Sequence, residues 1–213
     1  MPRITHISAI FTGLFFFLFL GLQACIIQTS ADGAFLQQLR KHCGEAFAGR
    51  VTSTDAADEN WRAERIIMHI RDCKDEEVKI ALHVGENRSR TWILRYEDLN
   101  KDSGQNTKRL ALRHDHRHED GSADAITYYG GLAADINPNR ITFPADQATK
   151  DLFDRENIPI SKTNIWAIII DPTQDLFAYE MTRPQRNFKI EFDTSKAVET
   201  PPPAWGWAEA TPN

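Results

Sequence analysis

Three histidines are the residues best placed to do chemistry in this sequence: His114, His116 and His118. They alternate with charged residues and continue the spacing of Leu110 and Leu112. Residues two positions apart in a β-strand point to the same face, so we expect the imidazoles on the face of the leucines. If the leucines face the interior of the protein, the imidazoles lie inside it or at its rim.

The segment after the histidines supplies candidate neighbours. A two-residue turn within 120–122 would fold the chain back, and His114 and His116 would then share their face with Thr127 and Tyr129. We therefore expect His114, His116 and Tyr129 to be polar contacts of a ligand.

Arg186 is a further candidate contact, for an anionic ligand, because it follows a turn at Pro184. Arginines at such turns pair more often with neighbouring acids. Pairing of Arg186 with a nearby carboxylate is therefore the alternative to a ligand contact.

The histidines also raise the question of a metal. Imidazoles two positions apart on a strand are about 6.6 Å apart at the backbone and can chelate one ion. His114 and His118 are about twice as far apart, so at most two of His114, His116 and His118 bind one ion. No cofactor is predicted. Zinc or another transition metal stays open as an alternative, as does a solvated, His-rich strand end.

Motifs of common enzymes are missing from the sequence. It contains no GxSxG, HExxH, CxxC, P-loop or GxGxxG, so no catalytic residue is assigned. The formal net charge of −5 argues against nucleic-acid binding, which needs a basic surplus. Hydrophobic residues make up 41% of the 213 residues and charged residues 26%, values typical of a globular domain.

The elements that must position these residues are mostly strands, since apolar residues alternate with polar ones along much of the chain. We predict a mainly β protein, an antiparallel barrel of about ten strands that is closed or nearly closed, with a two-sheet sandwich as the alternative. His69 and His83 have the parity opposite to their apolar neighbours and should face solvent. The expected strands are 47–53, 65–71, 78–84, 92–96, 110–112, 125–132, 140–143, 164–170, 176–181 and 187–192.

Two helices interrupt the alternation, a short one over 34–42 and one over 145–157 that opens after Pro144. The barrel domain is expected over 34–196, after a linker at 25–33. Residues 197–213 form a Pro- and Trp-rich tail that either lies across the barrel or hangs free.

The first residues are typical of an export signal, because a short segment with Arg3 precedes an apolar run from Ile10 to Leu22. Three endings compete. Residues 22–25 resemble a bacterial lipobox, which makes 1–24 the signal peptide and Cys25 the lipidated residue. Cleavage as late as 31, or an uncleaved anchor, are the alternatives. All three place the domain outside the cytoplasm, in the periplasm, anchored to the outer membrane or secreted.

The remaining cysteines, Cys43 and Cys73, form an even pair. Exported chains seldom keep isolated thiols, so we predict a disulfide, worth about 3–4 kcal/mol of stability. Two buried free thiols are the alternative.

Several runs together resemble a family of exported bacterial proteins: RSRTW at 88–92, RHDHRHEDGS at 113–122, YGG at 129–131, FPAD at 143–146 and RPQRNF at 183–188. The resemblance implies an extracytoplasmic location and leaves the chemistry open. At the level of architecture, a helix followed by about ten antiparallel strands resembles the calycins, which include lipocalins and fatty-acid-binding proteins. That resemblance implies a barrel holding one small apolar ligand, although the calycins' opening Gly-x-Trp has no counterpart at Gly49.

We therefore expect an exported, lipid-anchored barrel that binds a small apolar or anionic molecule. One alternative is a metal-binding protein or metal-dependent hydrolase that uses His114, His116 and His118. Another is a structural envelope lipoprotein whose interior is filled with side chains.

Overall fold

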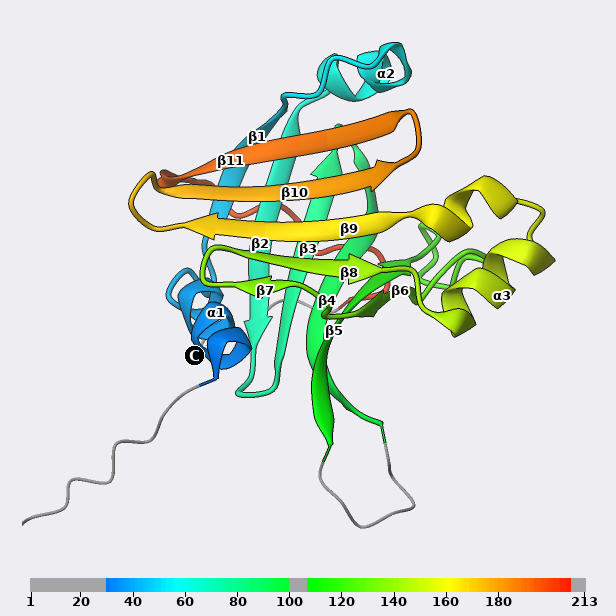
Figure 1. Cartoon of the computed structure of the whole chain (residues 1–213). Helices are drawn as coiled ribbons and strands as arrows, with labels where there is room; N and C mark the ends of the chain where they lie inside the picture. The colour runs from blue at the N-terminus through cyan, green and yellow to red at the C-terminus, as the bar shows by residue number, and fades with distance from the viewer. Residues whose placement is uncertain (1–29, 100–106, 208–213) are drawn as a thin grey trace, which may run out of the picture.

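The computed structural model describes residues 30–99 and 107–207, and within them the chain is mainly β (Figure 1). The signal segment and the predicted lipidation site, Cys25, lie outside these residues. The strands are β1 (Ala46–Val51), β2 (Ile66–Cys73), β3 (Glu77–Val84), β4 (Asn87–Asp98), β5 (Lys108–His116), β6 (Tyr129–Leu132), β7 (Ile136–Asn137), β8 (Arg140–Pro144), β9 (Ile165–Asp171), β10 (Leu176–Arg183) and β11 (Arg186–Val198). The helices are α1 (Ala31–Arg40), α2 (Glu59–Arg62) and α3 (Gln147–Arg155), with 3-10 turns η1 (Ala56–Asp58) and η2 (Pro159–Thr163).

All eleven strands of the described chain join one antiparallel sheet, in the order β6-β5-β4-β3-β2-β1-β11-β10-β9-β8-β7. The prediction of an antiparallel β protein is confirmed, and one continuous sheet replaces the two sheets of the sandwich alternative. The sheet curls strongly but stays open, with β6 and β7 as its edges (Figure 1).

Strand β6 nevertheless contacts the end of β8, the strand next to the short edge strand β7. The backbone N–H of Asp146, just after β8, donates to the carbonyl oxygen of Gly130 in β6 at 3.1 Å. A Cβ on Gly131 would lie 1.8 Å from the carbonyl oxygen of Pro144, so only glycine permits this approach. The curled sheet thus encloses an interior without a full ladder between its edges.

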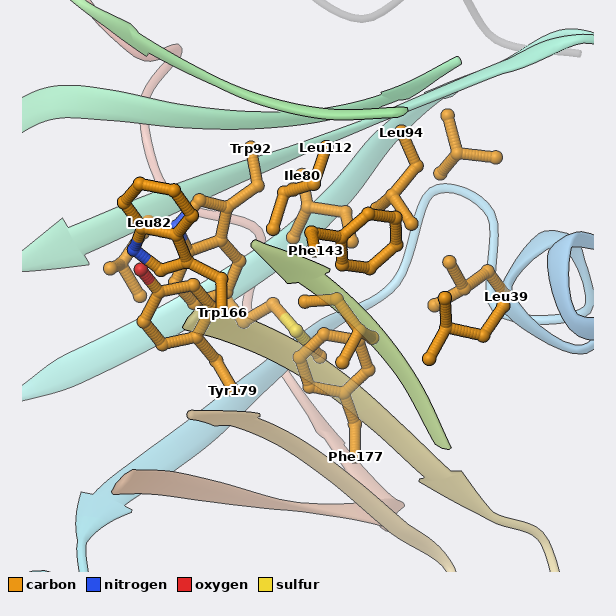
Figure 2. Packing of buried hydrophobic residues seen from close by; sticks show 14 of the residues in the cluster. Leu39, Ile80, Leu82, Trp92, Leu94, Leu112, Phe143, Trp166, Phe177 and Tyr179 are labelled. Atoms are coloured by element: carbon orange, nitrogen blue, oxygen red, sulfur yellow. The ribbon is translucent and has the colours of Figure 1, made fainter. Parts of the chain in front are cut away.

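The interior is filled by the side chains of one strand face, as the alternation predicts. Ile80 and Leu82 of β3 meet Trp92 and Leu94 of β4 there, and all four are at most 2% exposed. Helix α1 covers one end of the sheet with Leu39, whereas Trp92, Trp166 and Tyr179 gather toward the other end (Figure 2). The buried Trp92, Trp166 and Tyr179 thus lie at the end remote from α1, whereas Phe35 and Phe47 are buried near the helix.

Cys43 and Cys73 form the predicted disulfide, with a Cα–Cα distance of 6.2 Å. It ties the chain after α1 to the end of β2, across 30 residues of sequence.

The C-terminal segment, residues 199–207, lies across the outer face of the sheet, as in one of the two arrangements predicted for the tail, and residues 208–213 lie outside the described part of the chain. The backbone N–H of Trp205 donates to the carbonyl of Arg88, and the indole Nε1 of Trp207 donates to Asp115 at 3.0 Å. The Lys79 ammonium lies 4.6 Å from the centroid of the Trp207 ring.

This covering corrects the prediction for His69 and His83. Both lie on the outer face, as their parity requires, but each is only 4% exposed. Their outer-face neighbours are engaged by the tail: Arg71 lies 5.9 Å from the Trp207 ring, and Arg88 donates to the carbonyl of Pro203. Parity gave the correct face of the sheet, but the outer face is not solvent-exposed here.

Candidate ligand-binding cavity

A cavity of about 280 Å³ opens at the end of the curled sheet remote from α1. The strands contribute their inward-facing residues to its wall, while α2, α3 and η2 cover it. The lining residues are Trp61, Leu82, Arg90, Trp92, His114, His116, Ile126, Tyr129, Phe153, Ile158, Ser161, Asn164, Trp166, Tyr179, Met181, Arg186 and Phe188.

The structure brings the four predicted ligand contacts together in this cavity: His114, His116, Tyr129 and Arg186. His114 lies opposite Tyr129 in the β5–β6 ladder, so the two residues share the inner face, as expected from the sequence. His118, in contrast, is exposed on the turn after β5 and does not line the cavity.

Thr127 does not share the inner face, contrary to the expectation from a two-residue turn. Its hydroxyl accepts from the backbone N–H of His116 at 2.8 Å, and Ile126 lines the cavity instead. The connection is longer and irregular: Arg117 pairs with Ala123, and Tyr128 has a φ of 54°. That irregularity shifts the parity before Tyr129 is reached.

Helix α3 is held against the sheet edge by its first turn. Asp146 caps the helix by accepting from the Thr149 N–H at 2.9 Å, and its other oxygen binds Arg113 of β5 at 2.6 Å. The buried Thr149 hydroxyl also bonds to the backbone of Gly130 at 2.8 Å. These contacts place Phe153 over the cavity, against the ring of Tyr129.

His114 is 2% exposed, and both of its ring nitrogens are hydrogen-bonded. Nδ1 lies 3.2 Å from the backbone carbonyl oxygen of Tyr129, which only accepts, so Nδ1 carries the proton. Nε2 then accepts from the Tyr179 hydroxyl at 2.8 Å. Burial lowers the pKa of His114 to about 3, with a smaller contribution from His116, so the ring is neutral at physiological pH.

His116 and Tyr129 form the second polar pair of the wall, with 3.2 Å between the phenol oxygen and Nε2. Burial, assisted by the nearby Arg90 charge, lowers the pKa of His116 to about 4. Burial also raises the pKa of Tyr129 to about 12. Both groups are therefore neutral, and neither supplies charge to the cavity.

Flat aromatic faces make up much of the wall. Trp92 and Tyr179 stack at a centroid distance of 4.3 Å with 9° between their planes. His114 and Tyr129 stack at 4.7 Å and 12°, and Trp166 leans on His114 at 5.0 Å. This surface favours a planar apolar molecule.

The two arginines of the cavity differ in their partners. Arg186 binds Asp58, whose side chain is fully buried, through both terminal nitrogens, one at 3.1 Å from Oδ2, and Asp55 lies 3.5 Å away. This pairing is the alternative interpretation given for Arg186 from the sequence. Arg90 binds only neutral oxygens among the described residues, those of Asn87 and Ser89 at 3.0 and 3.2 Å.

Within residues 30–99 and 107–207, no three His, Cys, Asp or Glu side chains gather in a way that could hold a metal ion. His114 uses both nitrogens in hydrogen bonds within the wall, and His118 points elsewhere. The structure therefore does not bring the three histidines together as a metal site.

Sequence reasoning missed Arg90, Trp61, Trp166 and Tyr179 as cavity residues. Arg90 could have been found, because it shares the parity of Trp92 and so places a charge on the apolar face of its strand. Trp61 lies on a short helix far away in sequence, and nothing in its local pattern indicates the cavity.

Comparison with protein families, with curated proteins and with solved structures finds no match to this chain. In the part of the chain that the structure describes, no helix is long and apolar enough to cross a membrane.

Proposed function

We propose that this protein binds a small molecule with an apolar, flat body in the cavity at the open end of the sheet. The observation that carries this proposal is the cavity itself: about 280 Å³ lined by aromatic side chains with a few polar groups among them. A purely structural barrel would fill this space with side chains, so the cavity counts against the packed alternative.

Binding of a neutral aromatic probe tests the proposal. Trp61, Trp92 and Trp166 line the cavity, so 2-naphthamide entering it should change the tryptophan fluorescence in a saturable way. Native mass spectrometry of protein purified from its own host should in addition show a co-purified small molecule. A protein that is always bare and that ignores the probe would contradict the proposal.

A pair of matched variants locates the binding. Ile126→Trp should block the cavity and abolish the fluorescence response, because Ile126 lines it. Ile136→Trp makes the same change at an exposed residue of β7, away from the cavity, and should leave the response intact. Equal responses in both variants would place the probe outside the cavity.

We also infer that the curled sheet forms a barrel of the calycin type, closed by contacts between β6 and the end of β8. The hydrogen bond between Asp146 and Gly130 and the close approach of Gly131 to Pro144 support a persistent junction there.

We further propose that the protein is exported and anchored to a membrane by lipid on Cys25. The disulfide supports export, because such bonds persist in oxidising compartments. Replacing Cys25→Ser should release the protein from the membrane fraction of its host. Unchanged fractionation would refute the lipid anchor and leave the binding proposal untouched.

A further inference from the structure

The charges around the cavity are unbalanced. Of its lining residues none carries a carboxylate, while two, Arg90 and Arg186, carry guanidinium groups. Asp58 and Asp55 neutralise Arg186 from behind the wall. Arg90 has no ion-pair partner in the described residues. Asp124 and Asp115 also act on the wall, through His116, but neither pairs with Arg90. Arg90 is therefore the one lining residue whose positive charge has no ion-pair partner in the described chain.

Arg90 faces the part of the cavity where the aromatic rings lie. Its guanidinium stacks 5.1 Å from the Trp61 centroid, and its charge acts on His116, Tyr129 and Tyr179. Burial lowers the pKa of Arg90 from its ordinary value, which reflects the cost of a partly desolvated cation. An anion brought beside it would offset that cost.

The two histidines and Tyr179 do not compete for this role. His114 and His116 are neutral, and His114 has no nitrogen left for a ligand. The Tyr179 hydroxyl already donates to His114, so toward the cavity it only accepts. Arg90 is thus the group best suited to receive a carboxylate, whose two oxygens match the guanidinium fork.

The size of the cavity limits the rest of the ligand. A dry cavity of about 150 Å³ holds one benzene, so about 280 Å³ suits one substituted ring or two fused rings. The aromatic side chains that line the cavity, among them Trp61, Trp92 and Trp166, give such rings an apolar wall to pack against.

We propose that the ligand is an aromatic monocarboxylate of one or two rings, with its carboxylate on Arg90 and its rings against the aromatic side chains that line the cavity. This inference rests on the proposed function, because it names the ligand class of the same cavity.

Three probes of equal heavy-atom count test it at pH 7: 2-naphthoate, its neutral isostere 2-naphthamide, and undecanoate, an aliphatic acid. Titration calorimetry should show 2-naphthoate binding at least about 10-fold more tightly than 2-naphthamide, the gain of a hydrogen bond to a charged group. It should also bind more tightly than undecanoate.

Variants assign the preference to Arg90. In Arg90→Gln, the affinities for 2-naphthoate and 2-naphthamide should become similar, whereas Arg90→Lys should keep part of the preference. Arg95→Gln is the matched control: Arg95 lies on the same strand, on the opposite face, and pairs with Glu97, so its loss changes net charge equally. This control should keep the full preference.

The outcomes separate the two proposals. If 2-naphthamide binds as tightly as 2-naphthoate to the unaltered protein, the anion site is refuted while the binding function stands. If undecanoate binds best, the aromatic class is refuted. If none of the three binds, the proposed function fails and the inference fails with it. Comparing the ligands within the unaltered protein keeps the test decisive even if Arg90→Gln does not fold.

Discussion

His114 shows at the scale of one residue how burial and hydrogen bonding determine the chemistry of the cavity. Its Nδ1 donates to a backbone carbonyl and its Nε2 accepts from Tyr179, so its orientation and tautomer are fixed. A ring held in this way is part of a rigid wall rather than a proton donor to a ligand.

The low pKa of His114 has a consequence for stability against pH. The folded-state pKa of about 3 lies below the ordinary value of 6.5, so the unfolded chain takes up a proton first as the pH falls. Keeping His114 neutral therefore favours the folded state. Its contribution to the free energy of unfolding is present above about pH 6.5 and is lost progressively as the pH falls toward 3. Lowering the pH from 7 to 5 should reduce the free energy of unfolding by about 2 kcal/mol for one such histidine.

Urea unfolding at the two pH values measures this loss. His116 and His83, with pKa values of about 4, act in the same direction. The unaltered protein should therefore lose more free energy of unfolding than His114 alone accounts for. His114→Gln should lose about 2 kcal/mol less than the unaltered protein. The same loss in both proteins would show that His114 titrates normally.

Tyr179→Phe tests the hydrogen bond that orients His114. Removing the hydroxyl leaves Nε2 buried without a donor, so the free energy of unfolding should fall by about 1–2 kcal/mol. Tyr128→Phe is the control, because Tyr128 is 42% exposed and should change stability by less than about 0.5 kcal/mol. Equal effects in thermal or urea unfolding would speak against a specific bond.

At the scale of elements, the C-terminal segment acts as a cover for the outer face of β2 to β5. Its anchor is the indole of Trp207, which donates to Asp115 and lies near Lys79 and Arg117. Trp205 contributes differently, since its Nε1 is buried and has no hydrogen-bond partner among the described residues.

These two tryptophans form a matched pair for a mutational test. Trp207→Phe leaves the fully buried carboxylate of Asp115 without one of its donors, whereas Trp205→Phe removes an N–H that has no partner. We expect Trp207→Phe to lower the urea midpoint more, by the equivalent of about 1–2 kcal/mol. A larger effect of Trp205→Phe would mean that ring packing, not the hydrogen bond, holds the segment.

At the scale of the whole molecule, the disulfide fixes the chain after helix α1 to the end of strand β2 and so holds the helix against the sheet. Replacing both Cys43→Ser and Cys73→Ser should lower the free energy of unfolding by about 3–4 kcal/mol. Adding a reductant to the unaltered protein should bring its melting temperature close to that of the variant. A melting temperature that ignores the reductant would show that the bond does not contribute.

Much of this fold could be predicted from local patterns. The alternation along 78–84 and 110–116 identified strands and their buried faces, and Pro144 marked the start of a helix. Two-residue β7 was missed, because a strand that short carries no alternation. The open sheet was not foreseen either, since closure depends on how far strands curl, which no local pattern encodes.

The sequence by itself determined which side chains share a face, and so it placed His114 and His116 with the apolar core. Alternation is a local property of a regular strand, and β5 pairs with both of its neighbours without a bulge, so the alternation holds along it. Only the tertiary structure decided which charges remain unpaired. Arg186 lies 128 residues from Asp58 and is neutralised by it, whereas Arg90 meets no acid in the described chain. Such pairings are set by the curl of the sheet, which brings distant strands and loops to one end of the molecule.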